Sequence, residues 1–189
     1  MKLKITKYVT ILFSCFLIIG CSLKSYSQNK ESVFDGHTIP TDENIMFYIQ
    51  KNTNPNTVVY ALNIRSDGKI NPKHPIEVFW RRYEEDGRRK KLGWLERTFA
   101  FDFKVKPVKS KPNTYVFSLV AMKKKKVYVT QNKSGSPEVF MKISGKIARL
   151  ERIYVMVDDS RRIQRVLTME LFGRNFKTGE LIYEKMVKN

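Results

Sequence analysis

Apolar and polar residues alternate along the chain from Asn44 onward, rather than apolar residues recurring every three or four positions. Successive side chains of a β-strand point to opposite faces, so this alternation predicts strands with one face on a core. One clear run places Phe99, Phe101, Phe103 and Val105 at alternate positions. The pattern predicts about nine strands, near residues 45–51, 57–65, 75–84, 98–106, 114–122, 126–131, 138–144, 146–157 and 163–172, and a last one at 180–187.

Gly, Pro and Asn residues punctuate these runs, for example at Asp67-Gly68, Asp86-Gly87 and Ser144-Gly145. Such dipeptides are typical of tight turns between strands. A spacing of about 10 to 15 residues per strand predicts a mainly all-β fold, an antiparallel β-barrel or β-sandwich meander. One short helix is expected at residues 89–97, where Leu92, Leu95 and Phe99 follow a helical spacing.

The N-terminal residues resemble an export signal, because Lys2, Lys4 and Lys7 precede an apolar stretch at residues 8–19. Residues 17–21, LIIGC, resemble a bacterial lipobox, in which Cys21 is acylated and becomes the mature N-terminus. We therefore expect a signal peptide at 1–20, a lipid-anchored flexible tether at 21–43 and a single β domain at 44–189. The expected location is the outer membrane, facing the periplasm or the surface. The alternatives are cleavage near Ser27, which gives a soluble periplasmic or secreted protein, and an uncleaved anchor.

The charge balance indicates which kind of ligand the expected exported domain would attract. The 189 residues include 36 Lys and Arg against 18 Asp and Glu, a formal net charge of +18. Cleavage before Cys21 removes three lysines and no acid, which leaves +15. A surface of this sign concentrates anions, although a run such as Lys123–Lys126 is usually just solvated. Exported proteins seldom meet nucleic acid, so an anionic envelope ligand is the expected partner, besides the membrane.

Few residues offer catalytic or metal-binding chemistry. The chain has only two histidines, His37 and His74, and only two cysteines, Cys15 and Cys21. Cleavage before Cys21 would leave no cysteine in the folded part, which excludes disulfides and thiolate catalysis there. Zinc-ligand spacings, nucleophile elbows and phosphate-binding loops do not occur in the sequence. We expect no catalytic residue, no metal and no cofactor.

The densest group of aromatic and charged residues lies between Pro75 and Arg97. Arg side chains beside Trp and Tyr suit a carboxylate or phosphate next to a ring, through bidentate bonds and stacking. The alternative is structural: Trp80 belongs to the core and the arginines pair with nearby acids such as Glu84, Glu85, Asp86 or Glu96. The candidate ligand-binding residues are Trp80, Arg81, Arg82, Tyr83, Trp94 and Arg97.

The same stretch resembles an uncharacterised bacterial envelope protein family, domain of unknown function 4833. Its pattern is a strand that ends in Trp before an Asp-Gly turn, then Leu, an Arg-containing helical turn and an Ala-aromatic-Gly step. The matching residues here are Trp80, Asp86-Gly87, Leu92, Arg97 and Ala100-Phe101. Asp102 stands where the family pattern has Gly, which puts a bulge or close backbone approach there in doubt. The resemblance extends from about Asn44 to Glu184 and implies no activity.

The expected function is therefore a non-catalytic binding module for an anionic ligand, which is a lipid, a glycolipid, a polysaccharide or an acidic partner. One alternative is an envelope hydrolase of phosphate- or sugar-containing substrates that uses Glu84, Glu96, Arg82 and Tyr83. Glycosidase carboxylates could also include Glu85 or Glu151, but sequence adjacency does not establish their separation across a cleft. The other alternative is a structural or assembly module that pairs through its edge strands.

Overall fold

The computed structural model describes residues 33–34, 36–160 and 165–187. The chain divides by its contacts into residues 1–31 and residues 32–189, and only the second unit contains described residues. The expected signal peptide and Cys21 therefore lie outside the described residues. The described part is mainly β with one short helix, which confirms the predicted fold class. No helix in it is long and apolar enough to cross a membrane.

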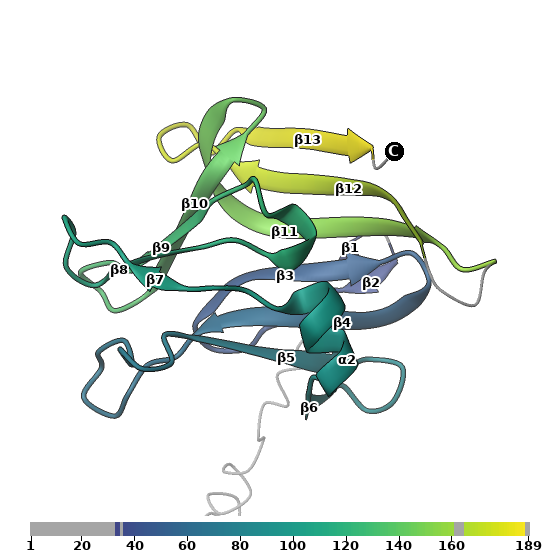
Figure 1. Cartoon of the computed structure of the whole chain (residues 1–189), viewed down its shortest axis with the longest axis horizontal. Coiled ribbons are helices and arrows are strands. Elements are labelled where there is room, and N and C mark those ends of the chain that lie inside the picture. Colours follow the sequence, from purple (N-terminus) through teal and green to yellow (C-terminus); the bar gives the residue numbers. More distant parts are fainter. Residues whose placement is uncertain (1–32, 35, 161–164, 188–189) are drawn as a thin grey trace, which may run out of the picture. The chain divides into compact units, whose positions relative to one another are not determined.

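Most of the strands form one curled, mostly antiparallel sheet that makes a half-barrel (Figure 1). Its main path runs β6-β5-β4-β3-β11-β10-β9-β8-β7, and β12 and β13 extend it from β11. The strands of this sheet are β3 (Ile45–Lys51), β4 (Asn54–Leu62), β5 (Ile76–Arg82), β6 (Arg88–Lys91), β7 (Lys106–Pro107), β8 (Thr114–Phe117), β9 (Val127–Gln131), β10 (Pro137–Ile143), β11 (Lys146–Asp158), β12 (Arg165–Arg174) and β13 (Leu181–Val187).

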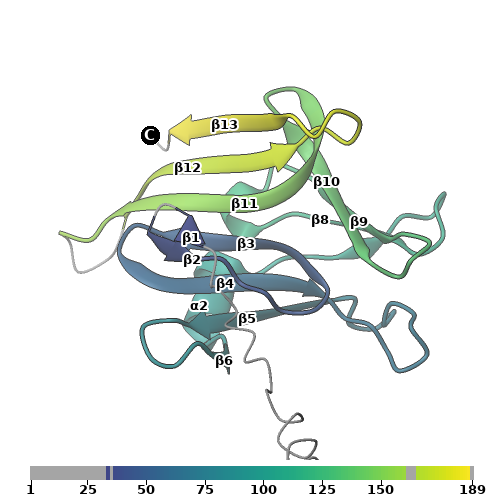
Figure 2. The same ribbon diagram turned by 180° about the vertical axis from the view of Figure 1, so that it is seen from behind.

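The long strand β11 divides the sheet into two wings. One edge of β11 pairs with β12 along most of its length. The other edge is shared, because β10 pairs with Lys146–Arg149 and β3 pairs in parallel with Arg152–Val155. A register shift between Leu150 and Arg152 lies between these two partners. The wings β3–β6 and β7–β10 consequently diverge from β11, as both views show (Figures 1 and 2).

Residues from both wings form one aromatic core. Phe47 stacks on Tyr60 with ring centroids 4.6 Å apart and lies 6.2 Å from Phe117 of the other wing. The Tyr60 hydroxyl donates a 2.8 Å hydrogen bond to the Phe101 carbonyl oxygen. Burial, together with the nearby Asp102 charge, raises the pKa of Tyr60, so this hydroxyl stays protonated and keeps its bond.

The segment between β5 and β8 differs from its predicted structure. The helix expected at 89–97 is wrong in extent, because residues 88–91 form β6 and the helix α2 covers only Trp94–Glu96. The strand expected at 98–106 is also wrong, because Arg97–Phe101 form a π-helical turn and only Lys106–Pro107 pair as a strand. The turn places Phe101 edge-on to Trp80, with centroids 5.5 Å apart. Core packing of this ring therefore outweighs the alternation that favours a strand.

The described part of the expected tether lies against the folded domain. Val33–Phe34 (β1) and His37–Thr38 (β2) form a small hairpin beside β3 and β11 (Figure 2). The buried His37 ring bonds through Nε2 to the Lys51 carbonyl oxygen at 2.8 Å. Gln50 Nε2 donates to the Thr38 carbonyl oxygen at 3.0 Å. Flexibility and lipid anchoring of residues 21–43 stay predictions.

Candidate functional site

Trp80 is a core residue, on the inward face of β5. Its side chain is 5% exposed and packs edge-on against Phe101. The indole Nε1 donates a 3.0 Å hydrogen bond to Glu96 Oε2, and the same oxygen accepts a 2.7 Å bond from the Gly93 backbone N–H. The bond from Trp80 attaches the short helix α2 to β5, and the bond from Gly93 caps the start of the helix.

The two arginines after Trp80 point to opposite faces and form internal ion pairs. Arg81 Nε donates to Asp42 Oδ2 at 2.8 Å, and Arg81 also bonds to the Gly87 carbonyl oxygen at 3.0 Å. The hydrogen bond to Asp42 raises the pKa of Arg81. Arg82 pairs with Glu85 at 3.1 Å. Both guanidinium groups thus already have a carboxylate partner.

The remaining candidates do not converge with the arginines on a common pocket. Tyr83 is half-buried after the end of β5, whereas Trp94 and Arg97 are exposed at the α2 turn. Arg81 borders a polar cleft of about 470 Å³, where the facing acids are Asp42, Glu43 and Glu77. Arg89 also borders this cleft and pairs with Glu77, so charges of both signs offset each other there.

The carboxylates of the hydrolase hypothesis are separately engaged. Glu84 accepts a 2.9 Å hydrogen bond from Asn56 Nδ2, and Glu96 accepts from Trp80 and Gly93. Glu85 lies between Arg82 and Arg88, which lower its pKa against the opposing effect of desolvation. Among the described residues, no group of three or more His, Cys, Asp or Glu could hold a metal ion.

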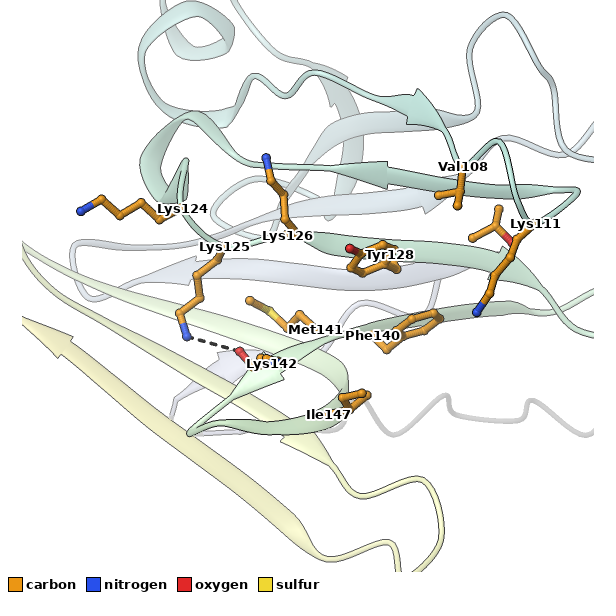
Figure 3. Close-up of a pocket in the computed structure, with 11 residues that line it drawn as sticks. Val108, Lys111, Lys124, Lys125, Lys126, Tyr128, Phe140, Met141, Lys142 and Ile147 are labelled. Carbon is orange, nitrogen blue, oxygen red and sulfur yellow. Dashed lines mark hydrogen bonds between the residues drawn. The ribbon is translucent and has the colours of Figure 1, made fainter.

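A different region has the geometry of a binding site. A cavity of about 780 Å³, which we call the lysine pocket, lies on the wing β7–β10 near its junction with β11 (Figure 3). This volume is within the usual range for small-molecule sites, roughly 300 to 1,000 Å³. Its lining residues are Val108, Lys111, Thr114, Lys124, Lys125, Lys126, Tyr128, Phe140, Met141, Lys142 and Ile147.

The floor of the lysine pocket contains two stacked rings. Tyr128 of β9 and Phe140 of β10 are directly opposite in the antiparallel ladder. Their centroids are 5.6 Å apart and the ring planes differ by 8°. Their neighbours Val127, Val129 and Met141 are buried in the core, so alternation turns both rings to the outer face. Ile147, 60% exposed, adds apolar surface to the same cavity.

The charged residues that line the lysine pocket are all lysines. Figure 3 shows Lys124, Lys125 and Lys126 at one end of the ring pair and Lys111 at the other. No Asp or Glu is among the described residues that line the cavity. Lys125 is neutralised, because its Nζ lies 2.6 Å from both carboxylate oxygens of Glu184. Within the described part of the chain, the other four lysines that line the cavity form no ion pair; they are Lys111, Lys124, Lys126 and Lys142.

Glu184 of β13 fixes the position of Lys125 at one end of the lysine pocket. Besides Lys125, its Oε2 accepts a 2.6 Å bond from the Ser144 backbone N–H. Burial raises the pKa of Glu184, but the bonds from Lys125 and Ser144 and the Lys125 charge outweigh it, so the pKa lies below its ordinary value of 4.5. The carboxylate thus connects β13 to the Lys123–Lys126 turn and to the β10–β11 turn.

Substitution Glu184→Gln is expected to lower the free energy of unfolding by about 1 to 2 kcal/mol at neutral pH, because charge-assisted bonds are lost. A carboxylate with a lowered folded pKa stabilises the fold above its unfolded pKa, and this contribution disappears as the pH falls through the folded pKa. The difference between wild type and variant should therefore be full at about pH 6 and shrink below about pH 4.5. Urea unfolding of both proteins across this range measures it, and a pH-independent difference would contradict it.

Sequence reasoning missed most of this site. From the sequence alone, the Lys123–Lys126 run is interpreted as solvated, and nothing in the pattern singles out Lys111 or Lys142. Tyr128 and Phe140 carried a usable signal, because each aromatic occupies a polar-face position between two core positions of its strand. The stacking of the two rings could not be predicted, because it depends on the pairing of β9 with β10 in the sheet.

The fold and the pocket define a basic β domain that presents a ligand-sized, lysine-rimmed cavity on one wing of an open half-barrel. The chain belongs to the family described as domain of unknown function (DUF4833), whose model matches residues 47–185 and so spans strands β3 to β13. The family resemblance expected from the sequence is confirmed. No curated protein matches the chain. No solved structure matches it either.

Proposed function

We propose that this domain is a non-catalytic binding module that takes an anionic ligand in the lysine pocket. The observation that carries the proposal is a floor of stacked rings beneath four lysines that have no carboxylate partner within the described residues. Binding of an anionic ligand is also the function expected from the net charge. The proposed site is the lysine pocket, in place of the candidate residues between Trp80 and Arg97.

The two parts of the pocket select complementary parts of a ligand. Lys111, Lys124, Lys126 and Lys142 offer flexible point charges, which suit a phosphate, sulfonate or carboxylate group. Tyr128, Phe140 and Ile147 offer apolar and ring surface beside them, which suits an acyl chain or a ring. An amphiphilic anion satisfies both requirements, whereas a small inorganic ion uses only the rim.

Anchoring through Cys21, expected from residues 1–21, forms part of the proposal. An acylated N-terminus would hold the pocket near a membrane, where amphiphilic anions are concentrated. Export and acylation stay predictions, since Cys21 lies outside the described residues.

The fluorescent anion 8-anilinonaphthalene-1-sulfonate tests the pocket, because it combines a sulfonate with aromatic rings. We expect the double variant Lys126→Ala/Lys142→Ala to weaken its binding about tenfold, since two charge contacts are lost. Binding should also weaken as salt rises, because the rim is exposed and screened. Titration of probe fluorescence gives the dissociation constant.

The matched control is Lys73→Ala/Lys104→Ala, which removes two charges from exposed positions that do not line the pocket. Dodecyl phosphate should displace the probe and dodecyltrimethylammonium should not. The proposal fails if the pocket variant and the control bind the probe equally, or if both detergents compete equally well.

A further inference from the structure

The turn Gly93–Arg97, which we call the Trp94 turn, exposes two large apolar side chains next to each other. Trp94 is 73% exposed and Leu95 is 59% exposed. Neither contributes to the core, although the next turn of chain supplies the buried Phe101. Adjacent exposed apolar side chains of this size indicate a contact surface rather than a stabilising feature.

The exposure of these side chains follows from how the turn is held. The Gly93 backbone N–H and the Trp80 indole both donate to Glu96 Oε2, at 2.7 and 3.0 Å. Thr98 Oγ1 adds a 3.0 Å bond to the Trp94 carbonyl oxygen. Glu96 therefore points to the sheet, and the Trp94 and Leu95 side chains are directed away from the core. The structure presents Trp94 and Leu95 on a fixed backbone.

Cations flank Trp94 and Leu95 along the chain. Lys90 and Lys91 end the edge strand β6 just before the Trp94 turn, and Arg97 is the last residue of the turn; all three are exposed. Within the described part of the chain they form no ion pair, whereas Arg88 and Arg89 pair with Glu85 and Glu77. The acid inside the turn, Glu96, is occupied by Trp80 and Gly93. The local field is positive.

We infer that the Trp94 turn is a docking surface for an anionic lipid bilayer. A Trp ring favours the interface between headgroups and acyl chains, and a Leu next to it adds apolar area. Lys90 pairs with Trp80 and so lies on the face of the sheet to which the turn is attached. Lys90 and Arg97 can contact lipid phosphates there, and their aliphatic stems let the charges reach the headgroups. None of these residues lines the lysine pocket, so this surface acts independently of the proposed ligand site.

Quenching by brominated lipid tests the insertion directly in the full chain. Trp94 and Trp80 are the two tryptophans of the protein, and Trp80 is buried in the core. Vesicles of brominated phosphatidylglycerol should therefore quench Trp94 emission, and this quenching should disappear in Trp94→Phe. The readout is local, so it distinguishes docking of this turn from any membrane binding by residues 1–21.

The charge requirement has its own variant and control. Lys90→Ala/Arg97→Ala should raise the vesicle concentration for half-maximal quenching about tenfold, because each basic residue near an anionic surface adds affinity. Lys133→Ala/Lys177→Ala removes two exposed charges elsewhere and should leave that concentration unchanged. Unquenched Trp94 emission in the presence of anionic vesicles overturns the inference. Equal quenching by phosphatidylcholine vesicles at every salt concentration also overturns it.

Discussion

Substitution Trp80→Ala is expected to lower the free energy of unfolding by about 3 to 5 kcal/mol, a large part of the stability of a typical domain. The indole is buried between the sheet and the π-helical turn, where it packs against Phe101 and bonds to Glu96. Truncation leaves a cavity and deprives Glu96 of its indole donor. The α2 turn would lose its main attachment to β5. Urea unfolding followed by circular dichroism measures the loss.

A second variant keeps this prediction testable if Trp80→Ala does not fold. Trp80→Phe retains most of the ring volume but cannot donate to Glu96, so its expected cost is smaller, about 1 to 2 kcal/mol. Binding of 8-anilinonaphthalene-1-sulfonate by the folded Trp80→Phe protein should equal that of wild type, because Trp80 does not line the lysine pocket. An unchanged stability in Trp80→Ala would show that the indole is not a core anchor.

The strands could be predicted from sequence because burial repeats locally. In β9, Val127 and Val129 are buried while Tyr128 between them is exposed, and this alternation is visible in five residues. The parallel pairing of β3 with β11 could not be predicted in this way. It joins Tyr48 to Arg152 and depends on which edges remain open after the hairpins have formed.

The prediction failed where tertiary contacts override alternation. Phe101 and Phe103 alternate as in a strand, yet Phe101 ends a π-helical turn. Phe103 lies in an isolated bridge to Leu119 and contacts Tyr60 and Phe117 edge-on. Both rings therefore reach the core without a regular strand. The hydrogen bond from Tyr60 to the Phe101 carbonyl satisfies the backbone of this irregular segment.

The candidate site was the least predictable part for the same reason. Trp80, Arg81 and Arg82 are adjacent in sequence, but alternation sends their side chains to different surroundings. Lys111 and Lys142 are distant in sequence, but pairing of β8, β9 and β10 brings them to one cavity. Residues that are adjacent in sequence therefore suggest a common site, although the strand geometry places their side chains in different surroundings.

Gly173→Ala is the smallest side-chain change with a large expected effect. Gly173 pairs with Leu150 in the β11–β12 ladder, beside the register shift where β11 divides the sheet. A Cβ there would lie 2.5 Å from the Arg149 carbonyl oxygen and 2.7 Å from Ile143 Cδ1. The carbonyl belongs to a paired strand and cannot rotate away as a side chain does. We expect a loss of about 2 to 3 kcal/mol, at the upper end for overpacking.

Gly93→Ala is the matched control, because the backbone of Gly93 lies in the extended region and its nearest contact is the Glu96 carboxylate at 3.3 Å. That group ends a flexible side chain, so the cost should be distinctly smaller. Equal destabilisation by both substitutions would contradict the close approach of β12 to β11. Because Ile143 and Arg149 belong to the β10–β11 hairpin that carries Phe140 and Ile147, Gly173→Ala should also weaken probe binding at the lysine pocket. The division of the sheet at β11 would then determine both the stability of the domain and the shape of its binding site.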